Sequence, residues 1–284
     1  MKNTANKTIS FPQYADWLKE YAEKSPHPFA KDSSKMISYC FELDKEIPNI
    51  YGWRFSTEDA LRKQLEHLKS PKDINSVYWK DQARNAEAYS MMTYWRGVEL
   101  LKAAIRSLNI HEVVPGAVLT RSLLELATVY LTNANIIEKA FTEIQIRENN
   151  IIVSKKIEEI LVKMIWGTRF GKPAPHLKQN NIMEYLRDLS KNQKASELLP
   201  TYEYLCDVAH PSFIGNTRYW SHVETLYEDG SERRIISRHA ETEPTQELLD
   251  KILWSLGWSA ACVRNSFELV RQGLSELLDK LDKS

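Results

Sequence analysis

The sequence has few of the residues that define several common protein classes. Its three cysteines, Cys40, Cys206 and Cys262, are odd in number, widely spaced and never part of a C-x-x-C pair. A disulfide framework and a cysteine-ligated zinc site are therefore not expected, and a reducing cytoplasm suits the chain best.

The chain has no net charge, because its 38 basic residues are matched by 38 acidic residues. This balance argues against a broad electrostatic surface for duplex DNA or acidic membranes, although it leaves room for a local basic cleft. No stretch approaches 18 uninterrupted apolar residues, and the first ten residues lack the apolar core of a signal peptide. We therefore expect no membrane span and a cytoplasmic location.

Glycine and proline are also sparse, with 9 and 11 residues respectively in 284. Few chain breaks favour long helices over many short strands. The length is sufficient to bury a real core, and the composition (43% hydrophobic, 27% charged) is that of an ordinary globular protein. The sequence therefore predicts a mostly all-α fold, a multi-helix bundle.

The most apolar predicted helix runs from Pro115 to Asn133, and its only charges are Arg121 and Glu125. A helix that is apolar almost all the way round belongs in the interior of a protein. The helix before it covers 84–109 and has a clear apolar face. The helix after it begins at Asn135 and can extend to residue 166, with a kink or division at residues 149–150.

The N-terminal part predicts three short helices before residue 70, joined by ordered loops. Several aromatic side chains are expected to pin these loops to the core: Tyr51, Trp53, Phe55, Tyr78 and Trp79. No linker clearly divides the chain. We expect an N-terminal helical segment, 1–83, packed on a main bundle, 84–284, as one compact unit.

One region does not favour helix. Between residues 218 and 239, two runs with strand character flank Asp229-Gly230, and Asp-Gly between such runs is a strong hairpin signal. The sequence therefore predicts a small β-hairpin insertion at 218–239. A long amphipathic helix follows, over 244–281.

Arg121, Glu125 and Thr128 form a narrow stripe, because they lie at positions i, i+4 and i+7 of the central helix. In one interpretation, two charges enter a cleft, where each needs a partner or a ligand. In the other, the stripe is the solvent edge of the helix and the two charges form a weak pair. The Arg-before-Glu order is the less favourable one for such a pair.

Asp207 and His210 lie one helical turn apart, which is the spacing of one half of a dinuclear metal site. Such a site needs two of these pairs. Among the seven histidines, only His210 follows an acidic residue at this spacing, so we predict no metal and no cofactor. Asp207 either orients the His210 ring for acid–base work or makes a helix-end polar contact.

The longest predicted loop, 167–181, is basic and rich in glycine and proline. Its Gly167-x3-Gly171-Lys172 run lacks the spacing, the trailing Ser or Thr and the preceding strand of a phosphate-binding loop. Arg169, Lys172 and Lys178 remain candidates for phosphate contact, and the alternative is a solvated loop.

Two segments together resemble a known family. R-S-L-L-E (121–125) and the later Y-E-Y-L-C-D-V-A-H-P-S (202–212) are similar to motifs of the DUF5677-like family of uncharacterised bacterial helical proteins. That family is similar in outline to HEPN-type bundles, which include metal-independent ribonucleases of toxin and phage-defence systems. In catalytic HEPN proteins an arginine precedes the histidine by a few residues on one helix. Here the corresponding positions are Glu203, Tyr204 and Leu205, so that arginine is absent.

The resemblance implies a helical bundle in which Arg121, Glu125 and His210 converge. A ribonuclease-like hydrolase or transferase would use Arg121 to stabilise phosphate charge and His210 as acid or base, with Glu125 or Asp207 orienting a neighbour. Tyr202 is a further expected contact to RNA or a nucleotide. Two alternatives remain open: a non-catalytic binding or scaffold protein acting through protein–protein association, and a purely structural role for these residues. A homodimer through helices is also expected.

Overall fold

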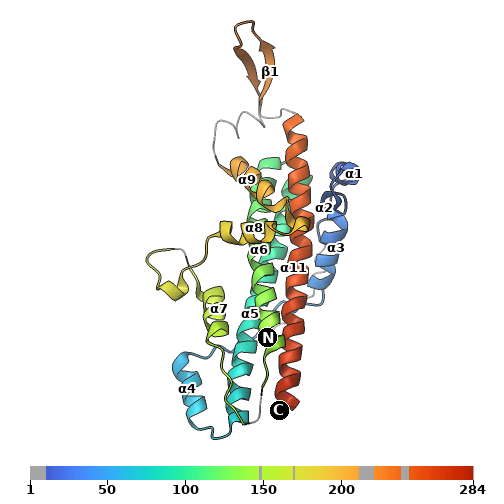
Figure 1. The fold of residues 1–284 in the computed structure, drawn as a ribbon. Coiled ribbons are helices and arrows are strands. Elements are labelled where there is room, and N and C mark those ends of the chain that lie inside the picture. Colours follow the sequence, from blue (N-terminus) through green and yellow to red (C-terminus); the bar gives the residue numbers. More distant parts are fainter. Residues whose placement is uncertain (1–10, 147–148, 169, 211–220, 238–242, 284) are drawn as a thin grey trace, which may run out of the picture. The chain divides into compact units, whose positions relative to one another are not determined.

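The computed structural model describes residues 11–146, 149–168, 170–210, 221–237 and 243–283. Most of these residues are helical, and the one sheet among them is a two-stranded antiparallel hairpin (Figure 1). The prediction of a mostly α-helical fold with a small hairpin is confirmed.

Three helices are much longer than the others: α5 (Pro71–Asn109), α6 (Val113–Glu143) and α11 (Glu243–Lys283). The shorter helices are α1 (Asp16–Lys24), α2 (Pro28–Lys31), α3 (Ser33–Asp44), α4 (Glu58–Glu66), α7 (Lys155–Trp166), α8 (Ile182–Ser190) and α9 (Leu198–Ala209). Two 3-10 turns, η1 (Pro175–Leu177) and η2 (Gln193–Ala195), and the strands β1 (Ser221–Leu226) and β2 (Glu232–Ile236) complete the described elements.

The chain divides into two compact units. Unit 1 comprises Met1–Asp44, Val98–Leu124 and Glu197–Ala260, and unit 2 comprises Lys45–Gly97, Glu125–Ser196 and Ala261–Ser284. Each of the three long helices contributes residues to both units. The boundary predicted after residue 83 falls inside α5, and the predicted division into 1–83 and 84–284 stays a prediction.

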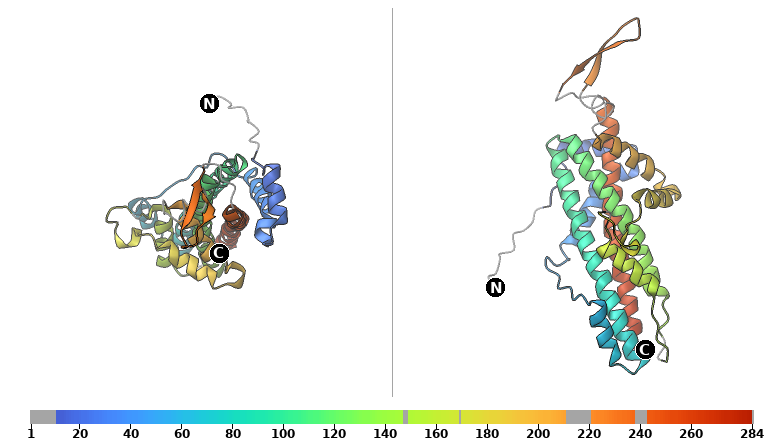
Figure 2. Two further views of the ribbon diagram at one scale, coloured as in Figure 1. Left: turned by 90° about the horizontal axis from the view of Figure 1, so that it is seen from above. Right: turned by 90° about the vertical axis from the view of Figure 1, so that its left-hand side faces the viewer.

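In unit 2, α5, α6 and α11 pack against one another, as the views in Figure 2 also show. The hydroxyl of Tyr130 on α6 donates to the carbonyl of Ser90 on α5 over 3.1 Å. The rings of Tyr94 on α5 and Phe267 on α11 lie 5.0 Å apart. Lys280 of α11 donates to a carbonyl in the last turn of α6 over 3.2 Å. These contacts place the core of unit 2 between three helices.

In unit 1, the turn between α5 and α6 contacts the start of α1 and the residues before it. The Asn109 side chain accepts from the Ala15 backbone N–H at 2.8 Å and donates to the Gln13 carbonyl at 2.7 Å. The ring of Trp17 stacks on His111 with 4.3 Å between centroids. The oxygen and the nitrogen of the Asn109 amide thus both form hydrogen bonds, and these bonds hold the start of α1 against this turn.

The hairpin lies within the predicted range of 218–239. Strands β1 and β2 pair antiparallel, with Ser221 opposite Ile236, and an irregularity interrupts the register between Val223 and Thr225. Gly230 in the turn has a φ of 82°, which a residue without a Cβ adopts at no steric cost. The Asp-Gly signal therefore located this element correctly.

The prediction of a helix boundary near Asn133 and Asn135 is wrong, because α6 continues through both. Asparagine favours helix ends when its side chain competes for nearby backbone groups. Here the Asn133 amide instead donates to the Tyr89 hydroxyl on α5 at 2.8 Å. The Asn135 amide donates to the carbonyl of Leu131, one turn back in the same helix, at 2.7 Å. Neither side chain caps a new helix.

The predicted helix from Asn135 to residue 166 is divided by a longer non-helical segment than expected. Trp79 of α5 donates its indole N–H to the Ile152 carbonyl at 2.9 Å, and the Asn75 side chain accepts from the Ile152 N–H at 2.8 Å. Helix α7 begins only after Ser154, whose hydroxyl caps it. Tertiary hydrogen bonds to α5 thus replace the helical ones.

Helix α5 begins earlier than predicted, at Pro71 instead of Arg84. Proline is well tolerated in the first turn of a helix, where its missing N–H has no intrahelical partner. The same proline that separates α5 from α4 therefore also starts α5.

Helix α6 is the one helix among the described residues that has the length and apolarity of a membrane span. In its most apolar window, 44% of the residues are buried inside the protein. Core helices share these properties, and Leu123, Leu124, Ala127 and Tyr130 of α6 are fully buried. The helix is therefore weak evidence for a membrane.

Gly257 of α11 lies close to the backbone of Phe29 in unit 1, so a substitution at this position tests the packing. A Cβ at this position would lie 2.2 Å from the backbone oxygen of Phe29. Within a helix, alanine is normally more stabilising than glycine by about 1 kcal/mol. At position 257, however, the backbone of Phe29 must shift to make room for the alanine Cβ. We expect Gly257→Ala to destabilise the protein by about 1–3 kcal/mol in urea unfolding. Gly52→Ala is the control, since nothing lies within 4 Å of a Cβ added there. A Gly257→Ala protein as stable as the wild type, or more stable, would contradict this packing.

Candidate functional site

Arg121 of α6 contacts α9, so the two segments of the predicted site meet in unit 1. Its Nε donates to the Cys206 sulfur at 3.0 Å, and its Nη2 donates to the Tyr202 hydroxyl at 3.1 Å. The guanidinium carbon also lies 5.3 Å from the centre of the Tyr202 ring. Because Tyr202 and Cys206 are four residues apart, the half-buried guanidinium spans one turn of α9.

The sequence of α9 explains how it presents these groups. One face of the helix is buried, and it includes Tyr202, Leu205 and Val208. The helix ends at His210, which has an extended backbone (φ −89°, ψ 137°). The predicted end is confirmed, and its cause is the following proline, which disfavours a helical conformation in the residue before it.

Asp207 and His210 lie on the exposed side of α9, together with Glu203. Their positions, 203, 207 and 210, form a single stripe on a helix. His210 follows Cys206 by one turn, so the histidine lies one turn beyond the contact with Arg121. The side chains of Asp207 and His210 are both exposed, so each can contact a ligand from solution. That Arg121 and His210 share one pocket stays a prediction.

The remaining predicted residues have different positions. Tyr202 is buried against Arg121, with its ring and its hydroxyl both in contact with the guanidinium. Glu125 is half-buried, one turn beyond Arg121 on α6, and belongs to unit 2. Lys172 is exposed in the loop after α7. Arg169 lies outside the described residues.

The described residues contain no group of three or more His, Cys, Asp or Glu side chains that could hold a metal ion. The chemistry on α9 is therefore that of an imidazole and a carboxylate on one exposed stripe, beside a buried tyrosine and a guanidinium. Such groups can transfer a proton and neutralise an anion.

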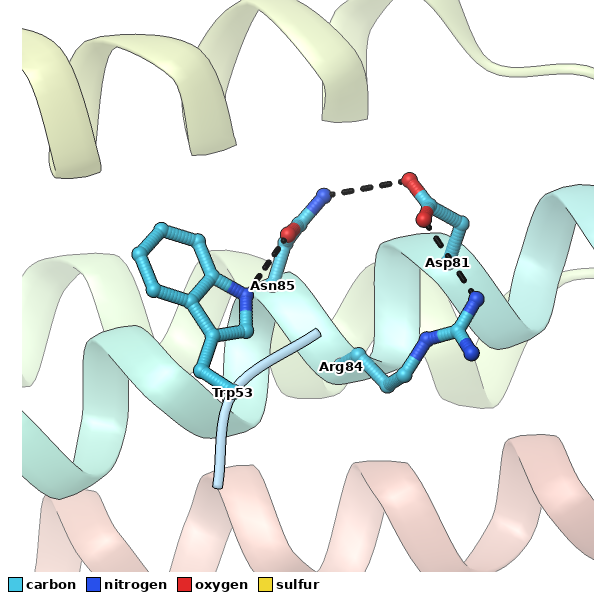
Figure 3. A network of polar contacts seen from close by, with 4 residues as sticks. All are labelled: Trp53, Asp81, Arg84 and Asn85. Carbon is cyan, nitrogen blue, oxygen red and sulfur yellow. Dashed lines mark hydrogen bonds and ion pairs between the residues drawn. The ribbon is translucent and has the colours of Figure 1, made fainter. Parts of the chain in front are cut away.

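A second polar cluster lies in unit 2, between α5 and the segment before α4 (Figure 3). The Trp53 indole N–H donates to the Asn85 side chain at 3.2 Å, and Asn85 donates to Asp81 at 3.3 Å. The other oxygen of Asp81 accepts from Arg84 at 3.4 Å. Asp81 is only 2% exposed, so these two donors compensate a buried carboxylate. Trp53 is thereby held to α5 at a defined orientation.

Tyr51 extends this attachment. Its hydroxyl donates to Glu87 of α5 at 2.6 Å. Burial first, and then the hydrogen bond and the charge of Glu87, raise the pKa of Tyr51 above its ordinary value. The phenol therefore stays protonated near neutral pH and remains a donor to Glu87.

Three aromatic rings gather beside this cluster. The ring of Trp166, the last residue of α7, lies 6.0 Å from Trp53 and 5.3 Å from Phe55. Trp53 and Phe55 are 5.5 Å apart. Trp166 and Phe55 remain 48% and 46% exposed. The prediction that aromatic residues pin the loops is confirmed for Trp53, but sequence reasoning missed the exposed surface formed by the three rings.

Comparison of the chain with models of known protein families, with curated proteins and with solved structures gives no match. The resemblance to the DUF5677-like and HEPN-type bundles therefore stays a prediction.

The Arg121–Tyr202 contact can be measured by a double-mutant cycle of Arg121→Met and Tyr202→Phe. A partly buried contact between a guanidinium and a hydroxyl should give a coupling energy of about 0.5–3 kcal/mol in urea unfolding. The matched control is the exposed pair Lys155–Glu159, for which about 0–1 kcal/mol is expected. Equal coupling energies for the two pairs would contradict the assigned contact.

The Trp53–Asn85–Asp81 chain predicts a further stability effect. Asn85→Ala removes the acceptor of the Trp53 indole and one donor to a buried carboxylate, so we expect a loss of about 1–3 kcal/mol. Asn135→Ala is the control, because Asn135 is an exposed residue within a helix, where alanine is neutral or favourable. Thermal unfolding of both variants measures the difference, and the account requires Asn85→Ala to unfold at the lower temperature.

Proposed function

We propose that the chain handles RNA or nucleotides at a site on α6 and α9 of unit 1. The observation that supports this proposal is the contact of Arg121 with α9, over Tyr202 and Cys206. It joins the Arg-containing helix to the helix that ends in His210. A cation and an exposed imidazole on joined helices are the groups needed to act on a phosphodiester.

The chemistry would be a transfer of the phosphoryl group within RNA. His210 accepts the proton of a ribose 2′-hydroxyl, whose oxygen then forms a bond to the adjacent phosphorus. The bond from phosphorus to the 5′-oxygen breaks, and the leaving oxygen takes up a proton from water. Arg121 stabilises the negative charge on the phosphate, and Asp207 orients the imidazole from the preceding turn.

One observation favours a non-catalytic alternative. Two hydrogen bonds of Arg121 end on side chains of α9 itself, at Tyr202 and Cys206. A guanidinium used in this way joins two helices and supports a binding or scaffold protein that acts by association with another protein. The two functions differ in the role of His210, which matters to catalysis and not to joining the helices.

The experiment is degradation of a labelled single-stranded RNA by the purified protein in the presence of a metal chelator. We expect His210→Ala to reduce the rate by about 10²–10⁴-fold, the usual contribution of a general acid–base group, while circular dichroism shows an unchanged fold. His222→Ala is the control, since His222 is an exposed histidine on β1. If the wild type and His210→Ala degrade RNA at equal rates, or if the wild type does not degrade it, the catalytic function is excluded. The association function then remains.

We further propose that the protein works in the cytoplasm, and the resemblance to a bacterial family is the reason to propose a bacterial source. The features that support this location are the absence of a disulfide among the described cysteines, at positions 40, 206 and 262, and the weak membrane signal of α6, the one candidate span in the described part of the chain. Association of two copies through helices also stays a proposal, and size-exclusion chromatography with light scattering tests it.

A further inference from the structure

The exposed aromatic surface of unit 2 is formed by Trp53, Phe55 and Trp166. The planes of Trp53 and Trp166 are inclined by 29°, so the two indoles are nearly parallel, whereas Phe55 meets both edge-on. Burying a large aromatic ring is favourable, and leaving two of them about half exposed requires an explanation. A surface of this kind offers flat faces on which another ring can stack.

The surface is held from inside the unit. The Trp53 indole N–H is bound to Asn85, and Asn85 is bound to buried Asp81, as Figure 3 shows. The edge of Trp53 is therefore fixed before any ligand arrives. A pre-ordered surface loses less conformational entropy on binding than a mobile one does.

The chain around Trp166 is basic. From residue 160 to residue 183 the sequence contains no Asp or Glu. Lys163 lies on the preceding turn of α7 and donates to Asn180. Lys178 is paired with Thr168, two residues after Trp166, through an isolated parallel bridge. Two ammonium groups thus belong to the segments directly before and beside the exposed indole.

Two carboxylates near these rings along the chain have cationic partners. Glu58, which follows Phe55 by three residues, pairs with Arg62 at 2.8 Å. Glu159, in the first half of α7, pairs with Lys155 at 3.8 Å. These pairs offset part of the negative charge on the two segments that carry Phe55 and Trp166.

We propose that this surface binds single-stranded RNA. Bases stack on the rings of Trp166 and Phe55, while Lys178 and Lys163 contact the flanking phosphates. Proteins that bind single strands combine these two elements, a basic groove and aromatic rings, because every base has a face that can stack. The choice of RNA over DNA rests on the proposed function of unit 1. The stacking of bases and the contacts to phosphates are independent of that function.

A protein partner explains the surface less well. An apolar partner would bury the rings but would also remove water from the lysines without neutralising them, which is unfavourable. A single-stranded nucleic acid provides a stacking face and a negative charge at every nucleotide. A partner protein is therefore one outcome of the test, and the proposal names RNA.

The test is fluorescence anisotropy of a labelled ten-nucleotide oligouridylate with the full chain at several salt concentrations. Trp166→Ala should weaken binding by roughly 5–100-fold, the effect of losing one stacked base. Trp166→Phe keeps a stacking ring and should recover most of the affinity. Lys178→Gln should lower the slope of log affinity against log salt by about 0.7, as expected for one lost phosphate contact to a single strand.

The matched control is Tyr227→Ala. Tyr227 is an aromatic residue of the same exposure, 48%, and it follows β1 in unit 1, outside the aromatic surface. Its removal should leave the affinity unchanged. A second probe, an oligomer of the same length without bases, keeps the phosphates and should bind much more weakly than the oligouridylate.

Three results would overturn the proposal: no binding of the oligouridylate by the wild type, equal binding of the oligomer without bases, or equal losses in Trp166→Ala and Tyr227→Ala. Self-association or protein binding that is lost in Trp166→Ala, without RNA binding, would assign the surface to a protein instead. Binding without cleavage by the wild type would refute the function of unit 1 alone.

Discussion

The guanidinium of Arg121 joins two parts of the chain that are 81 and 85 residues apart in sequence. A half-buried cation in a largely apolar stretch of helix needs a polar partner, since its charge cannot be left in an apolar surrounding. Tyr202 and Cys206 provide that partner from one face of α9. This contact links α6 to α9, the helix that carries Asp207 and leads to His210. Both the catalytic and the structural interpretation of unit 1 start from it.

Part of this arrangement could be predicted from the sequence. The only two charges of the central helix identified Arg121, and the proline after His210 fixed the end of α9. The partners of Arg121 could not be predicted in the same way. Tyr202 and Cys206 form hydrogen bonds with it because of the relative rotation of two helices, and rotation about a helix axis depends on packing and not on local sequence.

The same limit on prediction from local sequence applies to the boundaries of the helices and strands. The hairpin turn follows local rules, because Asp229-Gly230 suits the backbone that the turn requires. Residues 149–154 do not, because their hydrogen bonds come from Trp79 and Asn75 of α5. The exposed aromatic surface was also beyond sequence reasoning, since Trp166 is more than 110 positions from Trp53 and the two meet only after folding. A tryptophan at the end of a helix, next to a segment without acidic residues, was the one available signal.

The most direct test of the central claim is nuclear magnetic resonance of isotope-labelled protein titrated with a ribodinucleotide. The account predicts that the Arg121 Nε–H signal and the His210 ring signals move together and saturate with one common Kd, because the two groups contact the same ligand. If the His210 signals move while Arg121 stays bound to Tyr202 and Cys206, or if neither moves, the two groups do not form one site. Arg121 is then a structural link between α6 and α9.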